Sequence, residues 1–145
     1  MPHVDEQRPI GWWVKRLDTL LEEVVDRVVA PEGLTRRHWQ ALHALAGGQE
    51  DRAALRTALA DFSAADAVDA VVSDLAGRGW VEPGDGDRVR LTADGRSAHD
   101  RIAVTVTRVR RHLADGLSAS EYERTILVLR RMVENVSRAL DRTER

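Results

Sequence analysis

Apolar residues recur every three or four positions along most of this chain, which is the spacing of one face of an α-helix. Trp13, Leu17 and Val24, for example, fall on one stripe of the first such segment. The six helices that this pattern predicts run over 11–30, 35–46, 51–60, 63–76, 92–115 and 118–142. Glycine or proline interrupts the chain at several of the boundaries, so the pattern indicates separate helices joined by short connections.

The helical spacing gives way to a strand pattern in one place, between the fourth and fifth predicted helices. Trp80-Val81-Glu82 is followed by Pro83-Gly84-Asp85-Gly86-Asp87, whose glycines and aspartates suit a tight turn. Arg88-Val89-Arg90-Leu91 then alternates polar and apolar side chains, as a half-exposed strand does. These segments predict a small β-hairpin, so the expected order is four helices, a hairpin and two further helices.

Hydroxyl-bearing residues stand where several of these helices are expected to begin. Thr35 and Thr92 are suited to cap the second and fifth helices, because a side-chain oxygen can accept a hydrogen bond from a free backbone N–H. Ser118-Ala119-Ser120-Glu121 has the spacing of a capping box. Ser63 followed by Asp66 resembles a capping box too, with aspartate in place of the usual glutamate, and predicts the start of the fourth helix.

Composition agrees with a single domain over residues 1–145. Apolar residues make up 43% of the chain, which is enough to form a core. The absence of cysteine excludes a disulfide framework, a cysteine nucleophile and a thiolate metal site, and it fits a reducing cytoplasm. The N-terminal sequence MPHVDEQRPIGWW has no continuous apolar run, so neither a signal peptide nor a membrane anchor is expected.

Charge is nearly balanced overall but unevenly placed. The formal net charge is −2, so the chain lacks the strong basic character of many nucleic-acid binders. Residues 64–76 carry three aspartates and no basic residue, whereas residues 84–111 carry seven arginines against four aspartates. Metal-ligand spacing, a phosphate-binding glycine loop and a nucleophile elbow are all missing from the sequence, so it predicts neither a metal site, a cofactor nor an enzyme.

Two stretches resemble the MarR family, the multiple antibiotic resistance regulators of bacteria. Leu75-Ala76-Gly77-Arg78-Gly79-Trp80-Val81 is similar to that family's element of arginine or lysine, glycine and two apolar residues. Asp87-Arg88-Val89-Arg90-Leu91-Thr92-Ala93-Asp94-Gly95-Arg96 is similar to its Asp-Arg element followed by Leu-Thr-x-x-Gly. Leu34-Thr35 at the start of the second helix and the order of the helices match as well.

The resemblance implies a mainly α fold, with a winged helix-turn-helix and a short β-hairpin wing flanked by N- and C-terminal dimerisation helices. The DNA-binding part would cover 34–96 and the dimerisation helices 11–30 and 97–142. By the same resemblance the chain would be a cytoplasmic homodimer that binds operator DNA and regulates transcription, most commonly as a repressor. A small aromatic or phenolic effector would bind in a cleft between the dimerisation and DNA-binding parts.

Four arginines are candidate DNA contacts under this reading. Arg88 and Arg90 lie on the predicted wing, where they could reach phosphates or the minor groove. The alternative is a solvated strand face paired with Asp85 or Asp87. Arg52 and Arg56 lie one turn apart on the third helix, as phosphate contacts or as ordinary surface charges.

The fourth helix, which would be the recognition helix, departs from the family. Its first turns offer Asp66 and Asp69, which can accept a hydrogen bond from cytosine but repel phosphates. The usual cations and long donors are missing. A second hypothesis is therefore a winged-helix dimer without sequence-specific DNA binding, which would serve as a ligand-binding or protein-interaction module.

The candidate effector-binding residues combine aromatic rings with positive or titratable groups. Trp13 and Trp39 could stack on an aromatic anion, and Arg16 or His43 could pair with its charge. The alternative is that both tryptophans only pack in the core.

Overall fold

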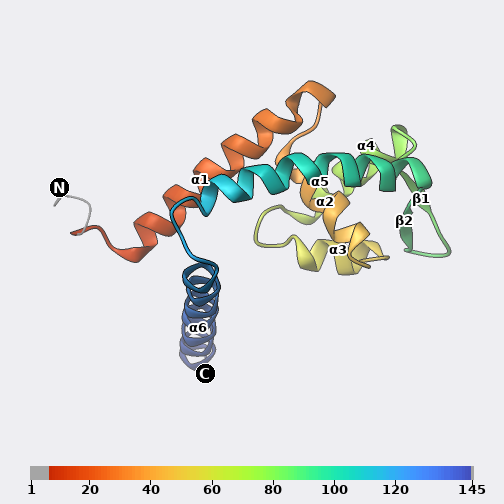
Figure 1. Ribbon diagram of the computed structural model, residues 1–145. Coiled ribbons are helices and arrows are strands. Elements are labelled where there is room, and N and C mark those ends of the chain that lie inside the picture. Colours follow the sequence, from red (N-terminus) through yellow and green to blue (C-terminus); the bar gives the residue numbers. More distant parts are fainter. Residues whose placement is uncertain (1–6, 145) are drawn as a thin grey trace. The chain divides into compact units, whose positions relative to one another are not determined.

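The computed structural model describes residues 7–144, and the order of their helices and strands is the predicted one (Figure 1). Contacts divide the chain into two compact units, one ending at Val109 and one beginning at Arg110, and each is described by itself. The elements are α1 Ile10–Val29, η2 Ala30–Glu32, α2 Arg36–Ala46, α3 Arg52–Ala58, α4 Ala65–Gly77, β1 Val81–Pro83, β2 Val89–Leu91, α5 Ala93–Leu113 and α6 Ala119–Thr143. Residues 1–6 lie outside the described residues, so the structure does not describe this part of the N-terminal segment, in which neither a signal peptide nor a membrane anchor is expected.

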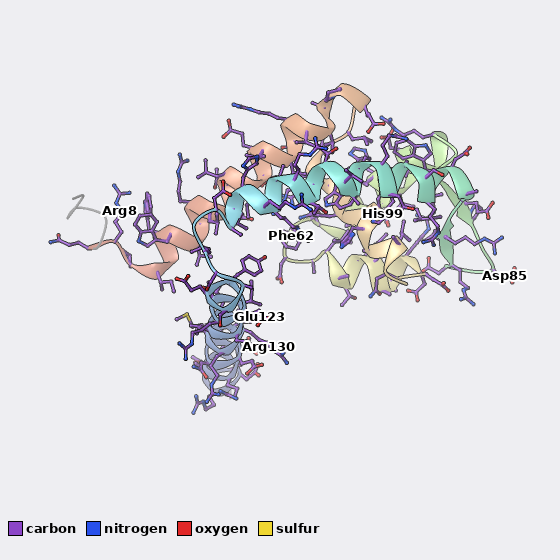
Figure 2. The ribbon with its side chains drawn as sticks, in the orientation of Figure 1. Arg8, Phe62, Asp85, His99, Glu123 and Arg130 are labelled. Carbon is purple, nitrogen blue, oxygen red and sulfur yellow. The ribbon has the colours of Figure 1, made fainter. Side chains whose placement is uncertain are left out.

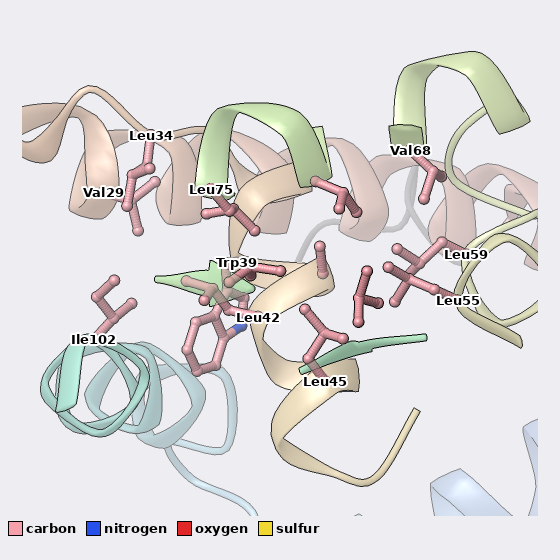
Figure 3. Packing of buried hydrophobic residues seen from close by; sticks show 14 of the residues in the cluster. Val29, Leu34, Trp39, Leu42, Leu45, Leu55, Leu59, Val68, Leu75 and Ile102 are labelled. Carbon is pink, nitrogen blue, oxygen red and sulfur yellow. The ribbon is translucent and has the colours of Figure 1, made fainter. Parts of the chain in front are cut away.

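The core of the first unit forms where α2 meets α3, α4 and the hairpin. Leu42 of α2, Leu55 of α3 and Leu75 of α4 are completely enclosed there, and Ile102 of α5 belongs to the same cluster (Figure 3). Burial of each such side chain stabilises the fold by about 1.5–3 kcal/mol. The apolar spacing predicts inward positions in the third and fourth helices, and these are confirmed as buried, or in the case of Val71 partly buried: Leu55, Leu59, Val68, Val71, Val72 and Leu75.

The hairpin is antiparallel and has a third, very short partner. Val81 pairs with Leu91 and Glu82 with Arg90, while Gly86 takes the left-handed backbone angle that the tight turn needs. Asp51 forms an isolated bridge with Arg88, and the chain around it adds hydrogen bonds to the second strand. The segment before α3 therefore extends the hairpin, and no sequence pattern predicted this connection.

The Leu-Thr-x-x-Gly element fixes the start of α5 against the hairpin. Thr92 donates its backbone N–H to the Trp80 carbonyl over 3.0 Å, and its hydroxyl donates to the Gly79 carbonyl over 2.6 Å. The same hydroxyl oxygen accepts the N–H of Gly95 at 3.0 Å, which confirms Thr92 as the cap. A Cβ atom at Gly95 would lie 2.0 Å from the Trp80 carbonyl oxygen, so only glycine lets the two segments approach this closely.

Two further predicted caps are confirmed. Ser118 and Glu121 form the reciprocal capping box of α6, each side chain accepting a backbone N–H of the other residue at 3.0 Å. The hydrogen bonds from the backbone and side chain of Ser118 hold the pKa of Glu121 below its ordinary value of 4.5. Thr35 is the N-cap of α2, where its backbone N–H donates to His38 Nδ1 over 3.1 Å.

The capping box predicted at Ser63 is wrong. The N-cap of α4 is Ala64, and the carboxylate of Asp66 accepts only the N–H of its neighbour Ala67, at 3.1 Å. Ser63 instead donates its own N–H to the carbonyl of Leu59 over 2.9 Å and so completes the turn after α3. Sequence spacing alone could not distinguish these two uses of one serine.

Both long terminal helices present apolar stripes to solvent within their own units. Trp13, Leu17 and Val24 of α1 stay exposed, whereas Val25 and Val29 near its end are buried in the core and Val28 packs against it. In the second unit, the stripe of α6 that includes Ile126, Val133 and Leu140 is exposed as well. No helix within residues 7–144 is both long and apolar enough to cross a membrane.

Candidate nucleic-acid interface

The outer face of α4 is the surface that a helix-turn-helix would turn towards DNA. Val68, Val72 and Leu75 bury the opposite face against the core. The exposed side carries small or acidic side chains, namely Asp66, Ala70, Ser73 and Asp74. Since α4 contains no lysine or arginine, this face by itself offers no attraction to phosphates.

Arg56 and Asp69, both predicted as DNA contacts, bind each other. Arg56 Nε and Nη2 donate to the two carboxylate oxygens of Asp69 over 2.9 and 3.1 Å, a bidentate pair that links α3 to α4. The side chains are 34% and 40% exposed. Contact of Arg56 with a phosphate would require it to leave Asp69.

The wing arginines project into solvent, and each contacts a glutamate. Arg88 Nη2 donates to Glu50 Oε2 over 2.8 Å, and Arg90 Nε donates to Glu82 Oε1 over 2.8 Å. The arginine side chains are 63% and 66% exposed. The partner of Arg88 is thus Glu50 and not one of the turn aspartates that the sequence offered as the alternative.

Arg52 differs from the other three arginines. Its backbone N–H donates to the carbonyl of Asp87 over 3.0 Å, which holds the first turn of α3 beside the wing. No carboxylate among residues 7–144 lies within ion-pair distance of its side chain. Among the four predicted DNA-contact arginines, Arg52 is therefore the one whose guanidinium group is not paired with a described carboxylate.

Carboxylates surround this surface. Asp85 lies at the outer tip of the hairpin (Figure 2), and Asp87 is exposed beside it. Together with Asp66 on α4 they place negative charge at the points that would come nearest to DNA. Apart from Arg56, which pairs with Asp69, the cations described on this surface are the wing arginines and Arg52.

A second group of candidate residues meets where α2 lies beside α5. The rings of His43 and His99 both stack on Trp39, with centroids 5.1 Å from it, and His43 Nδ1 lies 3.1 Å from His99 Nε2. His99 Nδ1 also lies 3.0 Å from the carboxylate of Asp100. Trp39 is buried, whereas His43 is exposed, so the cluster reaches from the core to the surface.

Trp13 and Arg16 are not brought to this cluster by any described contact. Trp13 packs edge to face with Trp12, with centroids 4.7 Å apart. Along α1 it lies about 18 Å from Val25, the first residue of that helix in the core. The predicted effector residues thus fall into two places, one on exposed α1 and one around Trp39.

Two further polar residues near the interface, Glu50 and His38, are not among the DNA contacts that the sequence predicts. Glu50 pairs with Arg88 because the neighbouring residue Asp51 forms a backbone bridge with Arg88. His38 Nε2 lies 2.8 Å from Asp74 Oδ2, and because His38 Nδ1 accepts the N–H of Thr35, Nε2 must be the donor. This contact joins α2 to α4. Within the described part of the chain, no group of three or more histidines and carboxylates is placed to hold a metal ion.

The arrangement of α3, α4 and the hairpin defines a winged helix-turn-helix. No family model and no curated protein matches the sequence, but many solved structures match the fold. The reduced form of MarR from E. coli has a TM-score of 0.75 at 18% identity and covers 91% of this chain and 98% of that one. A MarR-family regulator from Silicibacter pomeroyi has a TM-score of 0.77 at 18% identity, covering 88% and 89%.

A MarR-family protein from Mycobacterium tuberculosis, Rv2887, was solved in complex with DNA. It has a TM-score of 0.69 at 23% identity and covers 90% of this chain and 98% of that one. At these identities the likeness establishes the fold. The chain therefore has the winged helix-turn-helix fold of MarR-family regulators, as the resemblance in the sequence predicted.

Proposed function

We propose that this chain is a DNA-binding transcriptional regulator of bacterial cytoplasm. The observation that carries the proposal is the hairpin, which projects Arg88 and Arg90 into solvent beside the exposed face of α4. The structure of Rv2887 with DNA supports it, because that neighbour has the same fold. In the proposed complex α4 lies in a major groove and the wing arginines contact phosphates or the minor groove.

We propose further that the chain acts as a homodimer. The support is the apolar side chains that α1 and α6 leave in solvent, among them Trp13, Leu17, Ile126 and Val133. Monomers rarely expose continuous apolar stripes, and a symmetric dimer is the most common way to cover them. Sedimentation of the purified chain should give twice the monomer mass of 16.2 kDa.

Repression relieved by a small aromatic ligand is the mode of regulation that we propose. Trp39, His43 and His99 offer stacked rings and titratable nitrogens near the surface, which suit an aromatic anion. Rv2887 has also been solved with p-aminosalicylic acid, at 22% identity and a TM-score of 0.67. Trp13 and Arg16 remain a second candidate place for such a ligand.

The test is a fluorescence-anisotropy titration of the promoter region of the chain's own gene, at about 50 and 200 mM salt. Arg88→Ala should weaken binding to every sequence by about threefold and reduce the salt slope by about 0.9, because one phosphate contact is lost. Arg27→Ala is the matched control, since Arg27 is an arginine at least as exposed as Arg88 and is paired with Glu23 on α1. Absence of wild-type binding at low salt would refute the proposal.

The acidic, cation-free face of α4 favours one other candidate function. In that case the chain is a winged-helix dimer that binds a ligand or a protein and does not read DNA sequence. The same titration distinguishes the two, provided an unrelated duplex is measured in parallel. A dimer that binds both duplexes equally, or neither, would support this second function.

A further inference from the structure

Backbone pairing fixes a glutamate beside each wing arginine. Val89 donates its N–H to the carbonyl of Glu50 over 2.8 Å, which holds Glu50 beside Arg88. Glu82 lies directly opposite Arg90 in the register of the hairpin. The backbone therefore places each glutamate beside its arginine, Glu50 through its bond with Val89 and Glu82 through the register of the hairpin.

A guanidinium group that is bound to a carboxylate cannot present the same N–H groups to a phosphate. To contact DNA, Arg88 must leave Glu50, and Arg90 must leave Glu82. Both pairs are largely exposed, so they are weak enough to open. Each glutamate is nevertheless held by the backbone, so it stays close to the incoming phosphate and repels it.

We propose that Glu50 and Glu82 compete with DNA phosphates for Arg88 and Arg90 and so set a low affinity of the wing for DNA of any sequence. This inference rests on the proposed function. The aspartates at the tip of the hairpin also repel phosphates, but they pair with neither arginine. A regulator restrained in this way spends less time on non-specific DNA, where phosphate contacts supply nearly all of the binding.

The competition has a signature in the dependence of affinity on salt. Contact between an arginine and a phosphate releases a counterion from DNA. The glutamate left behind repels the neighbouring phosphates, and this repulsion cancels part of the attraction between arginine and phosphate at low salt, where screening is weak. Glu50→Gln and Glu82→Gln should each tighten DNA binding by about threefold at low salt and steepen the salt slope by about 0.9. In the double variant, the two gains in binding free energy and the two changes in slope should approximately add.

The experiment measures wild type, Glu50→Gln, Glu82→Gln and the double variant by anisotropy, on the promoter duplex and on an unrelated duplex. Glu23→Gln is the matched control, because Glu23 also pairs with an exposed arginine but lies on α1. Thermal melting confirms that the variants remain folded. The proposal expects tighter binding on both duplexes for the wing variants and no change for the control.

Two negative results have different meanings. If the wild type binds and the wing variants bind within twofold of it with the same salt slope, the competition is refuted while the proposed function stands. If the wild type does not bind at low salt, the proposed function fails and this inference fails with it.

Discussion

Replacement of Gly95 by alanine tests the packing of α5 against the hairpin. The new Cβ would lie 2.0 Å from the carbonyl oxygen of Trp80 and 2.8 Å from its carbonyl carbon. Ordinary contact begins at about 3.4 Å, so the two backbone segments would have to separate by about 1.4 Å, which is 3.4 minus 2.0. Both neighbours are backbone atoms, and no side-chain rotation can relieve the clash.

The cost follows from three effects. Forcing packed backbone segments apart costs about 1–3 kcal/mol. The hydrogen bond from Thr92 to the Trp80 carbonyl bridges the same gap, and its weakening adds about 1 kcal/mol. Alanine recovers up to about 1 kcal/mol over glycine in a helix. Gly95→Ala should therefore destabilise the chain by about 1–3 kcal/mol.

Urea denaturation followed by circular dichroism measures this difference in the free energy of unfolding at a fixed protein concentration. Gly77→Ala is the matched control: it is also helical, and a Cβ there meets nothing within 4 Å. The control should be neutral or stabilised by up to about 1 kcal/mol. A Gly95→Ala variant within about 0.5 kcal/mol of the wild type would show that α5 does not approach the hairpin as described.

Two other predictions concern polar contacts. The pKa of Glu121 is lowered by its hydrogen bonds with Ser118, so the charged carboxylate stabilises the start of α6 at pH values above the unfolded pKa of 4.5. This stabilisation is lost as the pH falls below that value, so Glu121→Gln should flatten the acid dependence of helix content in circular dichroism. An unchanged acid dependence in Glu121→Gln would contradict the capping role of Glu121. A double-mutant cycle of Arg56→Ala and Asp69→Ala should give a coupling of about 0.5–1 kcal/mol in unfolding, because the bidentate pair is partly exposed. Coupling indistinguishable from zero would mean that the pair does not link α3 to α4.

Most of the fold follows from local rules that act within a few residues. The stripes of Val68, Val72 and Leu75 on one helix and Leu55 on another locate the core, because burial of one face is what makes a short helix stable. Caps at Thr92 and Ser118 are local too. The wrong prediction of a capping box at Ser63 shows where local rules are insufficient. The N–H of Ser63 makes an equally local hydrogen bond to Leu59 at the end of the preceding helix.

The candidate site was less predictable because its contacts join residues far apart in sequence. The sequence identified Arg56, Asp69 and Arg88 as separate charges, and the structure shows that the first two neutralise each other. Glu50 precedes Arg88 by 38 positions and meets it only through a one-residue bridge. Pairing of this kind depends on tertiary geometry, which periodicity and composition do not encode.

The charges on this surface also determine where sequence specificity can arise in the proposed regulator. The small, acidic face of α4 cannot make the bidentate arginine contacts that read guanine, and phosphate contacts from the wing position a protein without reading bases. The proposed homodimer would hold two such lobes at a set separation, so binding of the second lobe would become intramolecular and would depend on whether that separation matches the DNA. Discrimination then comes mainly from half-site spacing and from groove width at the wing arginines. If the proposed effector exists, we expect it to release the DNA by changing the separation of the lobes.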